Sequence, residues 1–158
     1  MSVLKKTRKM YKQIDERIKR VEGFSLSSPY GEGGSLGQPL GVKSVGLVKV
    51  YTESGIYGLG ETYSGVYAPE LIQPVVSFLE SYLVGRLIGD DSIFDDIKNI
   101  PFIGSNGILR SVFSAIEIAI WDARGKILDV PISQLINNNS RKSIPLYASS
   151  GTVIFTPD

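Results

Sequence analysis

The residue types that most often perform chemistry in enzymes are scarce in this sequence. Its 158 residues contain no histidine and no cysteine. Together these absences exclude Ser-His-Asp triads, thiol nucleophiles, disulfides and zinc sites built from histidine or thiolate ligands. Lysines and carboxylates remain, but no catalytic motif surrounds any of them, so we expect no catalytic residue in this chain.

Three sets of carboxylates could still take part in chemistry, and for each we favour a structural role. Asp122 lies among apolar neighbours and Lys126 follows it by one helical turn, which predicts a structural ion pair. Glu61 is a single acid at the end of a predicted strand. Asp90 and Asp91 precede a short apolar-periodic segment, where acids cap a helix, and no third metal ligand is near them in the sequence. We therefore predict no metal site in this chain.

A basic stretch and a glycine-rich stretch both lack the features of a binding motif. Residues 1–13 carry five Lys or Arg side chains, but a single basic run without interleaved aromatic residues is more typical of a solvated terminus. Gly-Glu-Gly-Gly at residues 31–34 lacks the lysine and the helix start of a phosphate-binding loop. The formal net charge is only +1, so we expect neither nucleic acid nor a membrane as a partner.

The first half of the chain has the periodicity of strands. Residues 17–26, 43–52 and 56–61 are β-friendly, and Gly55 supplies the left-handed residue of a short hairpin loop between the last two. Three consecutive strands of this kind predict an antiparallel meander. Residues 27–41 are rich in Gly, Pro and Ser, so we expect a long loop there, and such loops are often functional.

The second half has helical periodicity. An apolar stripe over residues 71–83 ends at Gly85, a short helix follows Asp91, and a long helix begins at about Ile108. The polar residues Arg110, Ser114, Glu117 and Arg124 fall outside the apolar stripe of the long helix. That stripe consists of Val112, Ile116, Ala119, Ile120 and Ala123. The fold class predicted is α+β, a three-stranded antiparallel meander followed by a helical bundle.

The composition places the chain among ordinary globular domains. Apolar residues make up 42% and charged residues 21% of the sequence. No apolar run approaches the roughly 18 residues of a membrane span, and the N-terminus lacks the hydrophobic region of a signal peptide. We therefore expect a cytoplasmic protein.

Three motifs in the chain resemble those of a known family. They are A-I-x-I-A-I-W-D-A-x-G-K-x-x-x-x-P-I at residues 115–132, V-x-V-Y-T-E-S-G-I-Y-G-L-G-E at residues 48–61 and I-P-L-Y-A-S at residues 144–149. In order and spacing they resemble the N-terminal domain of the mandelate racemase/muconate lactonizing branch of the enolase superfamily. Asp129 departs from the pattern, since the family commonly has Gly there, but Asp tolerates the left-handed conformation that this turn requires.

The resemblance implies an α+β capping domain that closes the mouth of a β/α barrel. In such enzymes the barrel supplies the lysine or histidine bases and the acidic ligands of magnesium. Mg is thus implied for a complete enzyme, and no cofactor is expected in this chain. Two cap loops help to choose the substrate, and by position these are residues 27–41 and 62–67. Tyr30 and Tyr63 are the substrate-binding candidates, because each places an aromatic ring with a hydroxyl group on one of these loops.

The resemblance also suggests how the chain is divided. Residues 1–13 are a basic extension, residues 14–142 the capping domain, and residues 143–158 a linker with the first strand of a barrel. A barrel needs roughly 200 or more residues, so its remaining strands are absent from this sequence. Without those neighbours, the apolar segment 144–155 is expected to associate with another copy of the chain.

Two functions from different classes remain open. The chain could be the cap of a divided enzyme, in which a separate barrel chain completes a site that abstracts a proton α to a carboxylate, as in acid-sugar dehydration. It could instead be a stand-alone remnant that folds and self-associates without catalysing a reaction. The sequence does not identify a substrate for the first of these.

Overall fold

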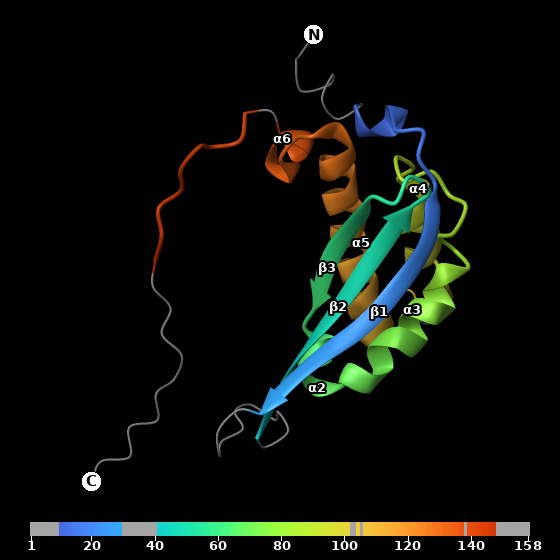
Figure 1. Ribbon diagram of the computed structural model, residues 1–158, viewed down its shortest axis with the longest axis vertical. Coiled ribbons are helices and arrows are strands. Elements are labelled where there is room, and N and C mark those ends of the chain that lie inside the picture. Colours follow the sequence, from blue (N-terminus) through green and yellow to red (C-terminus); the bar gives the residue numbers. More distant parts are fainter. Residues whose placement is uncertain (1–9, 30–40, 102–103, 105, 138, 148–158) are drawn as a thin grey trace.

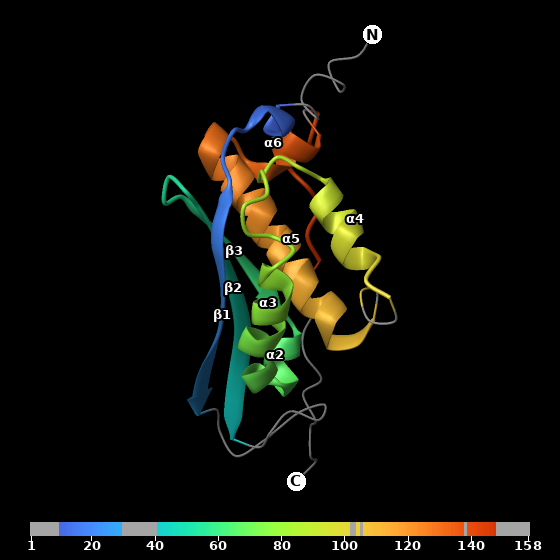
Figure 2. The same ribbon diagram turned by 90° about the vertical axis from the view of Figure 1, so that its right-hand side faces the viewer.

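The computed structural model describes residues 10–29, 41–101, 104, 106–137 and 139–147. A three-stranded sheet lies on one side of the molecule and the helices cover its other side (Figures 1 and 2). The α+β prediction, a meander followed by helices, is therefore confirmed. The described elements, in chain order, are η1 (Tyr11–Gln13), β1 (Ile18–Pro29), β2 (Val42–Thr52), β3 (Tyr57–Thr62), α2 (Ser64–Tyr67), η2 (Pro69–Leu71), α3 (Ile72–Glu80), α4 (Ser92–Lys98), α5 (Gly107–Leu128) and α6 (Ile132–Ile136).

The sheet has the strand order β1-β2-β3, and both neighbouring pairs are antiparallel. Burial alternates along β2, where Val48, Val50 and Thr52 face the helices and are fully buried. The residues between them lie on the opposite face, which no described helix covers. Gly55 turns the chain between β2 and β3 with φ of 89°, as its position in the sequence predicts.

The long helix α5 packs across the sheet and forms the centre of the core. All five residues of the predicted stripe are fully buried. Gly58 and Gly60 allow this close packing, because a Cβ atom at either position would collide with the backbone carbonyl of Ala119 or Ala115 on α5. The helix ends at Asp129, which adopts the left-handed conformation (φ 51°, ψ 45°) expected for it.

The stripe predicted over residues 71–83 is shorter as a helix than its periodicity indicates. Pro69 begins the one-turn η2, and α3 itself runs only from Ile72 to Glu80. Pro74 lies in the first turn of α3, where its missing N–H needs no acceptor. Leu83 is nevertheless fully buried, in the turns that lead to Gly85, so the apolar pattern reports burial beyond the end of the helix.

The structure describes residues at both predicted boundaries of the domain, near residues 13 and 143. Tyr11, assigned by sequence to the basic extension, is only 4% exposed and packs edge-on against Trp121, with 5.0 Å between ring centroids. The end of that segment is therefore part of the core. The first barrel strand is not observed, since residues 143–147 pair with no strand and residues 148–158 lie outside the described residues.

Candidate functional site

One end of the sheet gathers the segments expected to face a substrate. The strands β1 and β2 are joined at this end, and α2 follows β3 there (Figure 1). Tyr30, the first substrate-binding candidate, lies outside the described residues. Tyr63, the second, immediately precedes α2 and is 64% exposed.

The expectation that residues 62–67 form a loop is wrong. The strand β3 continues to Thr62 and α2 begins at Ser64. The hydroxyl group of Thr62 lies 2.8 Å from that of Ser111 on α5, and it also accepts a hydrogen bond from the backbone N–H of Ser64 at 3.3 Å. These bonds tie the start of the helix to both β3 and α5. A helix of four residues is too short to show a periodic pattern in the sequence.

Two glycines fix the position of α2 on the sheet. A Cβ atom on Gly65 would collide with the backbone nitrogen of Gly46 on β2, so the two backbones are in direct contact. Gly65 is buried by this contact. The short helix is thus held by the sheet, and its tyrosines keep a defined position relative to the strands.

Tyr67 joins Tyr63 to form an exposed tyrosine pair. The two rings meet edge to face, with centroids 5.5 Å apart, and their hydroxyl oxygens are 3.3 Å apart. The hydrogen bond with Tyr63 raises the pKa of the Tyr67 hydroxyl above its usual value. The hydroxyl groups of the pair are hydrogen-bond donors or acceptors beside apolar ring faces. The sequence analysis missed Tyr67, although the spacing of four residues on a helix predicts the contact.

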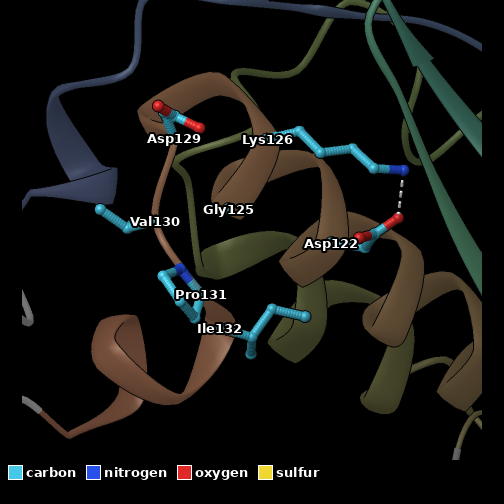
Figure 3. A pocket seen from close by; sticks show the side chains of 7 residues that line it. All are labelled: Asp122, Gly125, Lys126, Asp129, Val130, Pro131 and Ile132. Atoms are coloured by element: carbon cyan, nitrogen blue, oxygen red, sulfur yellow. Dashed lines mark hydrogen bonds and ion pairs between the residues drawn. The ribbon is translucent and has the colours of Figure 1, made fainter.

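The ion pair predicted between Asp122 and Lys126 is confirmed, with 2.6 Å between Nζ and Oδ2 (Figure 3). Asp122 is half-buried, which corrects the expectation of a buried carboxylate. Its Oδ2 also accepts a hydrogen bond from the backbone N–H of Leu59 at 2.8 Å, and Lys126 donates to the carbonyl oxygen of Tyr57 at 3.0 Å. The pair therefore satisfies outward-facing backbone groups of the edge strand β3.

A hollow of about 490 Å³ lies beside this pair at the end of α5. In Figure 3 the Asp122 and Lys126 side chains point toward each other, and Asp129 lies apart from them. The lining residues are Asp122, Gly125, Lys126, Asp129, Val130, Pro131 and Ile132. Because the hydrogen bonds to β3 already hold the paired charges, we assign no catalytic role to this hollow.

Asp90 and Asp91 have separate structural roles. Asp90 accepts a hydrogen bond from the backbone N–H of Ser92 at 2.9 Å, and the hydrogen bonds it receives from Arg86 and Ser92 lower its pKa to about 2. Asp91 precedes α4 but makes no capping bond with its side chain. It accepts a hydrogen bond from the Tyr11 hydroxyl at 2.8 Å instead.

Arg124 is fully buried, although the sequence analysis placed it outside the apolar stripe of α5. Its Nε donates to the carbonyl oxygen of Ile88 at 2.7 Å, and its Nη2 lies 3.1 Å from Oδ1 of Asp91. The second contact is an ion pair without hydrogen-bond geometry, so within the described residues neither Nη atom has a hydrogen-bond acceptor. The guanidinium also lies against the rings of Tyr11 and Trp121, at 4.4 and 4.7 Å from their centroids. Burial lowers the pKa of Arg124.

A magnesium site does not fit the residues that the structure describes. Among them, no three acidic side chains come close enough together to hold a metal ion. Glu61 lies exposed on the uncovered sheet face, and within the described segments it makes no hydrogen bond or ion pair. We therefore derive no chemical step through a metal in this chain.

The comparisons with known proteins agree with this arrangement. The profile of the mandelate racemase/muconate lactonizing enzyme N-terminal domain matches residues 38–137, which is more than half of the chain. The chain belongs to this family. The matched residues of the mandelate racemase/muconate lactonizing enzyme N-terminal domain include β2, β3, α5 and both members of the tyrosine pair.

Individual relatives of this N-terminal domain are longer proteins. A D-galactonate dehydratase family member of Paenibacillus sp. (strain JDR-2) is 35% identical over 111 residues, which cover 66% of this chain and 26% of the relative. A D-mannonate dehydratase of Sphingomonas sp. (strain SKA58) is 32% identical over 114 residues, or 68% of this chain and 27% of that protein. The chain thus spans about a quarter of the length of the curated relatives it matches.

Solved structures show the same fold for this N-terminal domain. The 3,6-anhydro-D-galactonate cycloisomerase of Zobellia galactanivorans superposes with a TM-score of 0.64 at 25% identity, over 77% of this chain and 32% of that one. A member of the enolase superfamily from Agrobacterium tumefaciens gives a TM-score of 0.65 at 25% identity, covering 77% of this chain and 37% of its own. None of the helices in the described part of the chain has both the length and the apolar character needed to cross a membrane.

Proposed function

We propose that this chain is the substrate-capping domain of an acid-sugar dehydratase, or of a related racemase or cycloisomerase, that abstracts a proton α to a carboxylate. The observation that carries the proposal is the exposed tyrosine pair at the end of the sheet where β1 ends and α2 follows β3. The names of the relatives, D-mannonate dehydratase among them, support acid sugars as the class of substrate.

In this proposal the tyrosine pair binds the carbon chain of a polyhydroxylated acid. The faces of the two rings cover C–H groups, and the hydroxyl groups of Tyr63 and Tyr67 exchange hydrogen bonds with sugar hydroxyls. Contacts of this kind orient a substrate and exclude water without taking part in proton transfer. The bases, together with magnesium and its ligands, belong to a barrel, which a separate chain would supply.

The second candidate is a stand-alone remnant that folds and self-associates. One observation favours it, since Ile144, Leu146 and Tyr147 are among the most exposed large apolar side chains in the described residues. Exposed apolar residues on an extended segment are a template for association. The two candidates differ in whether the domain can support catalysis when a barrel is present.

A chimera tests the proposal. Residues 10–142, which retain the buried Tyr11, replace the N-terminal domain of the Sphingomonas D-mannonate dehydratase, and dehydration of a panel of acid sugars is measured against the parent enzyme. We expect the chimera to turn over at least one acid sugar. Tyr63→Ala in the chimera should raise the KM for that sugar about tenfold, which corresponds to about 1.4 kcal/mol of binding free energy.

The matched control is Phe78→Ala, which removes a similarly exposed ring from α3 and should leave KM unchanged. A folded chimera that turns over no member of the panel would contradict the proposal and favour the remnant. Equal effects of the two substitutions would refute the role of the tyrosine pair.

A further inference from the structure

The sheet has two edges, and side chains cap much of both. On β3, Asp122 and Lys126 bind the outward-facing backbone groups of Leu59 and Tyr57. On β1, side chains of α3 likewise accept hydrogen bonds from the outward-facing N–H groups. The backbone N–H of Val21 donates to Glu80 at 3.2 Å, and the N–H of Gly23 donates to Gln73 at 2.8 Å. Capping of this kind prevents an edge strand from pairing with another chain.

The outer half of β1, from Ser25 to Pro29, has no such caps. Successive outward-facing N–H groups lie two residues apart, so Ser25 and Ser27 follow Val21 and Gly23 along the same edge. Within the described part of the chain, the backbone N–H and C=O groups of Ser25 and Ser27 have no hydrogen-bond partner. Figures 1 and 2 show this part of β1 extending with β2 beyond α3.

The side chains of this segment also lack the usual protection of an edge. All five residues, Ser-Leu-Ser-Ser-Pro, are uncharged and exposed. Leu26 is 59% exposed and lies on the face of the sheet that the described helices leave open. Natural edge strands that must stay single usually carry a charge, most often Lys, at such positions.

We propose that this segment of β1 pairs with β1 of a second copy of the chain, antiparallel about a two-fold axis at Leu26. Within this segment only Ser25 and Ser27 present both an outward-facing N–H and an outward-facing C=O, since Pro29 on the same edge has no N–H. The register that uses both residues therefore places Ser25 opposite Ser27 of the other copy, and the reverse. This arrangement forms four backbone hydrogen bonds and brings the two Leu26 side chains together in a non-hydrogen-bonded pair.

A second copy is the occupant that the segment fits best. The two free residues are identical in type and symmetric about Leu26, so the edge is complementary to itself under a two-fold rotation. No charged residue lies within the segment, so no like charges are opposed in the pairing and no charged peptide is favoured. The inference goes beyond the proposed function and does not depend on it.

A single engineered cysteine tests the register. The chain has no cysteine, so Leu26→Cys introduces the only thiol. Residues in a non-hydrogen-bonded antiparallel pair have Cα atoms about 4.5 Å apart, within the roughly 4.4–6.8 Å that a disulfide spans. We expect Leu26→Cys to form a disulfide-linked dimer on mild oxidation, whereas Leu59→Cys, on the same face of the sheet but beside the capped edge of β3, should remain monomeric on a denaturing gel. Equal cross-linking at positions 26 and 59 would overturn the proposal.

Sedimentation velocity over a range of concentrations tests the pairing without a cross-link. Leu26→Lys places two like charges at the axis, and Ser25→Pro removes an N–H that has no acceptor among the described residues of its own chain, so each should weaken the dimer at least tenfold. Leu59→Lys is the control and should leave the dimer unchanged, and circular dichroism confirms that each variant folds. A wild-type chain that is monomeric at every concentration, or an association insensitive to Leu26→Lys, would refute the proposal. So would binding of the edge by another protein while the chain alone stays monomeric.

Discussion

Arg124 shows at the scale of single residues how a polar position can become part of a core. A helical projection assigns it to the polar side of α5, because the residue type and the spacing are all that the sequence provides. The structure surrounds it with Tyr11, the carbonyl oxygen of Ile88 and Asp91, three groups that lie far from it in the chain. These groups lie beside Arg124 because of the path that the chain takes in three dimensions, which no local sequence pattern specifies.

Asp90 leads to a prediction about pH. Its pKa is about 2 in the folded chain, below the ordinary value of 3.8, so the folded state binds this proton less readily than the unfolded state. The resulting stability is fully present above about pH 4 and is lost as the pH falls toward 2. The Asp90 side chain is 37% exposed, so solvent screening reduces the contribution to about 1 kcal/mol.

Asp90→Asn should therefore lower the free energy of unfolding at pH 7 by about 1 kcal/mol and have a smaller effect near pH 2. Urea unfolding at both pH values measures the difference. Asp129→Asn is the control, because Asp and Asn both tolerate the left-handed backbone conformation at this position. A cost for Asp90→Asn that is equal at pH 7 and pH 2 would show that the carboxylate charge is not responsible.

At the scale of elements, the sequence predicted the ends of the three strands and the start of α5 to within three residues. Alternation and helical spacing are local properties, and the burial they require is the burial observed along β2 and α5. Glycine within a strand, as at Gly58 and Gly60, also allows another backbone or side chain to approach closely. The sequence could not identify α5 as that backbone, nor predict that Asp122 and Lys126 would cap β3, because both depend on tertiary packing.

Gly58 provides the test of this packing. In Gly58→Ala the new Cβ atom would collide with the carbonyl of Ala119, so α5 must move away from β3, and we expect a loss of about 2–3 kcal/mol in the free energy of unfolding. Gly55→Ala is the control. A Cβ atom there meets nothing within 4 Å, and only the positive φ is strained, which should cost about 1 kcal/mol.

Urea unfolding of the two variants shows which substitution causes the larger loss in the free energy of unfolding. If Gly58→Ala costs no more than Gly55→Ala, then the contact between β3 and α5 is looser than the structure indicates. The same experiment on Gly60→Ala, which faces Ala115, should reproduce the larger loss.

At the scale of the whole molecule, the candidate site was only partly predictable. The resemblance predicted Tyr63 as a substrate contact on a loop, and its role in binding stays a prediction. The contact of Gly65 with Gly46 that holds α2, and with it Tyr67, needed the structure. Tyr30 lies outside the described residues and stays a prediction.

The last prediction concerns the segment that follows α6. Ile144, Leu146 and Tyr147 are exposed, at 66%, 89% and 90%, on residues that pair with no described strand. Burying these three side chains between copies would contribute about 3 kcal/mol, counting about 1 kcal/mol each for incomplete burial. That is sufficient to strengthen an association about 100-fold, and it would act in addition to the pairing proposed for β1.

We therefore expect the full chain to form species larger than a dimer, and a chain that ends at Lys142 to stop at the dimer. Light scattering over a concentration series measures both. Leu146→Asp should reproduce the truncation, because a charge prevents burial of the segment. Ile136→Asp, at a residue of α6 that is likewise exposed, should leave the larger species intact. If the full chain and the chain ending at Lys142 have the same mass at every concentration, residues 144–155 take no part in association.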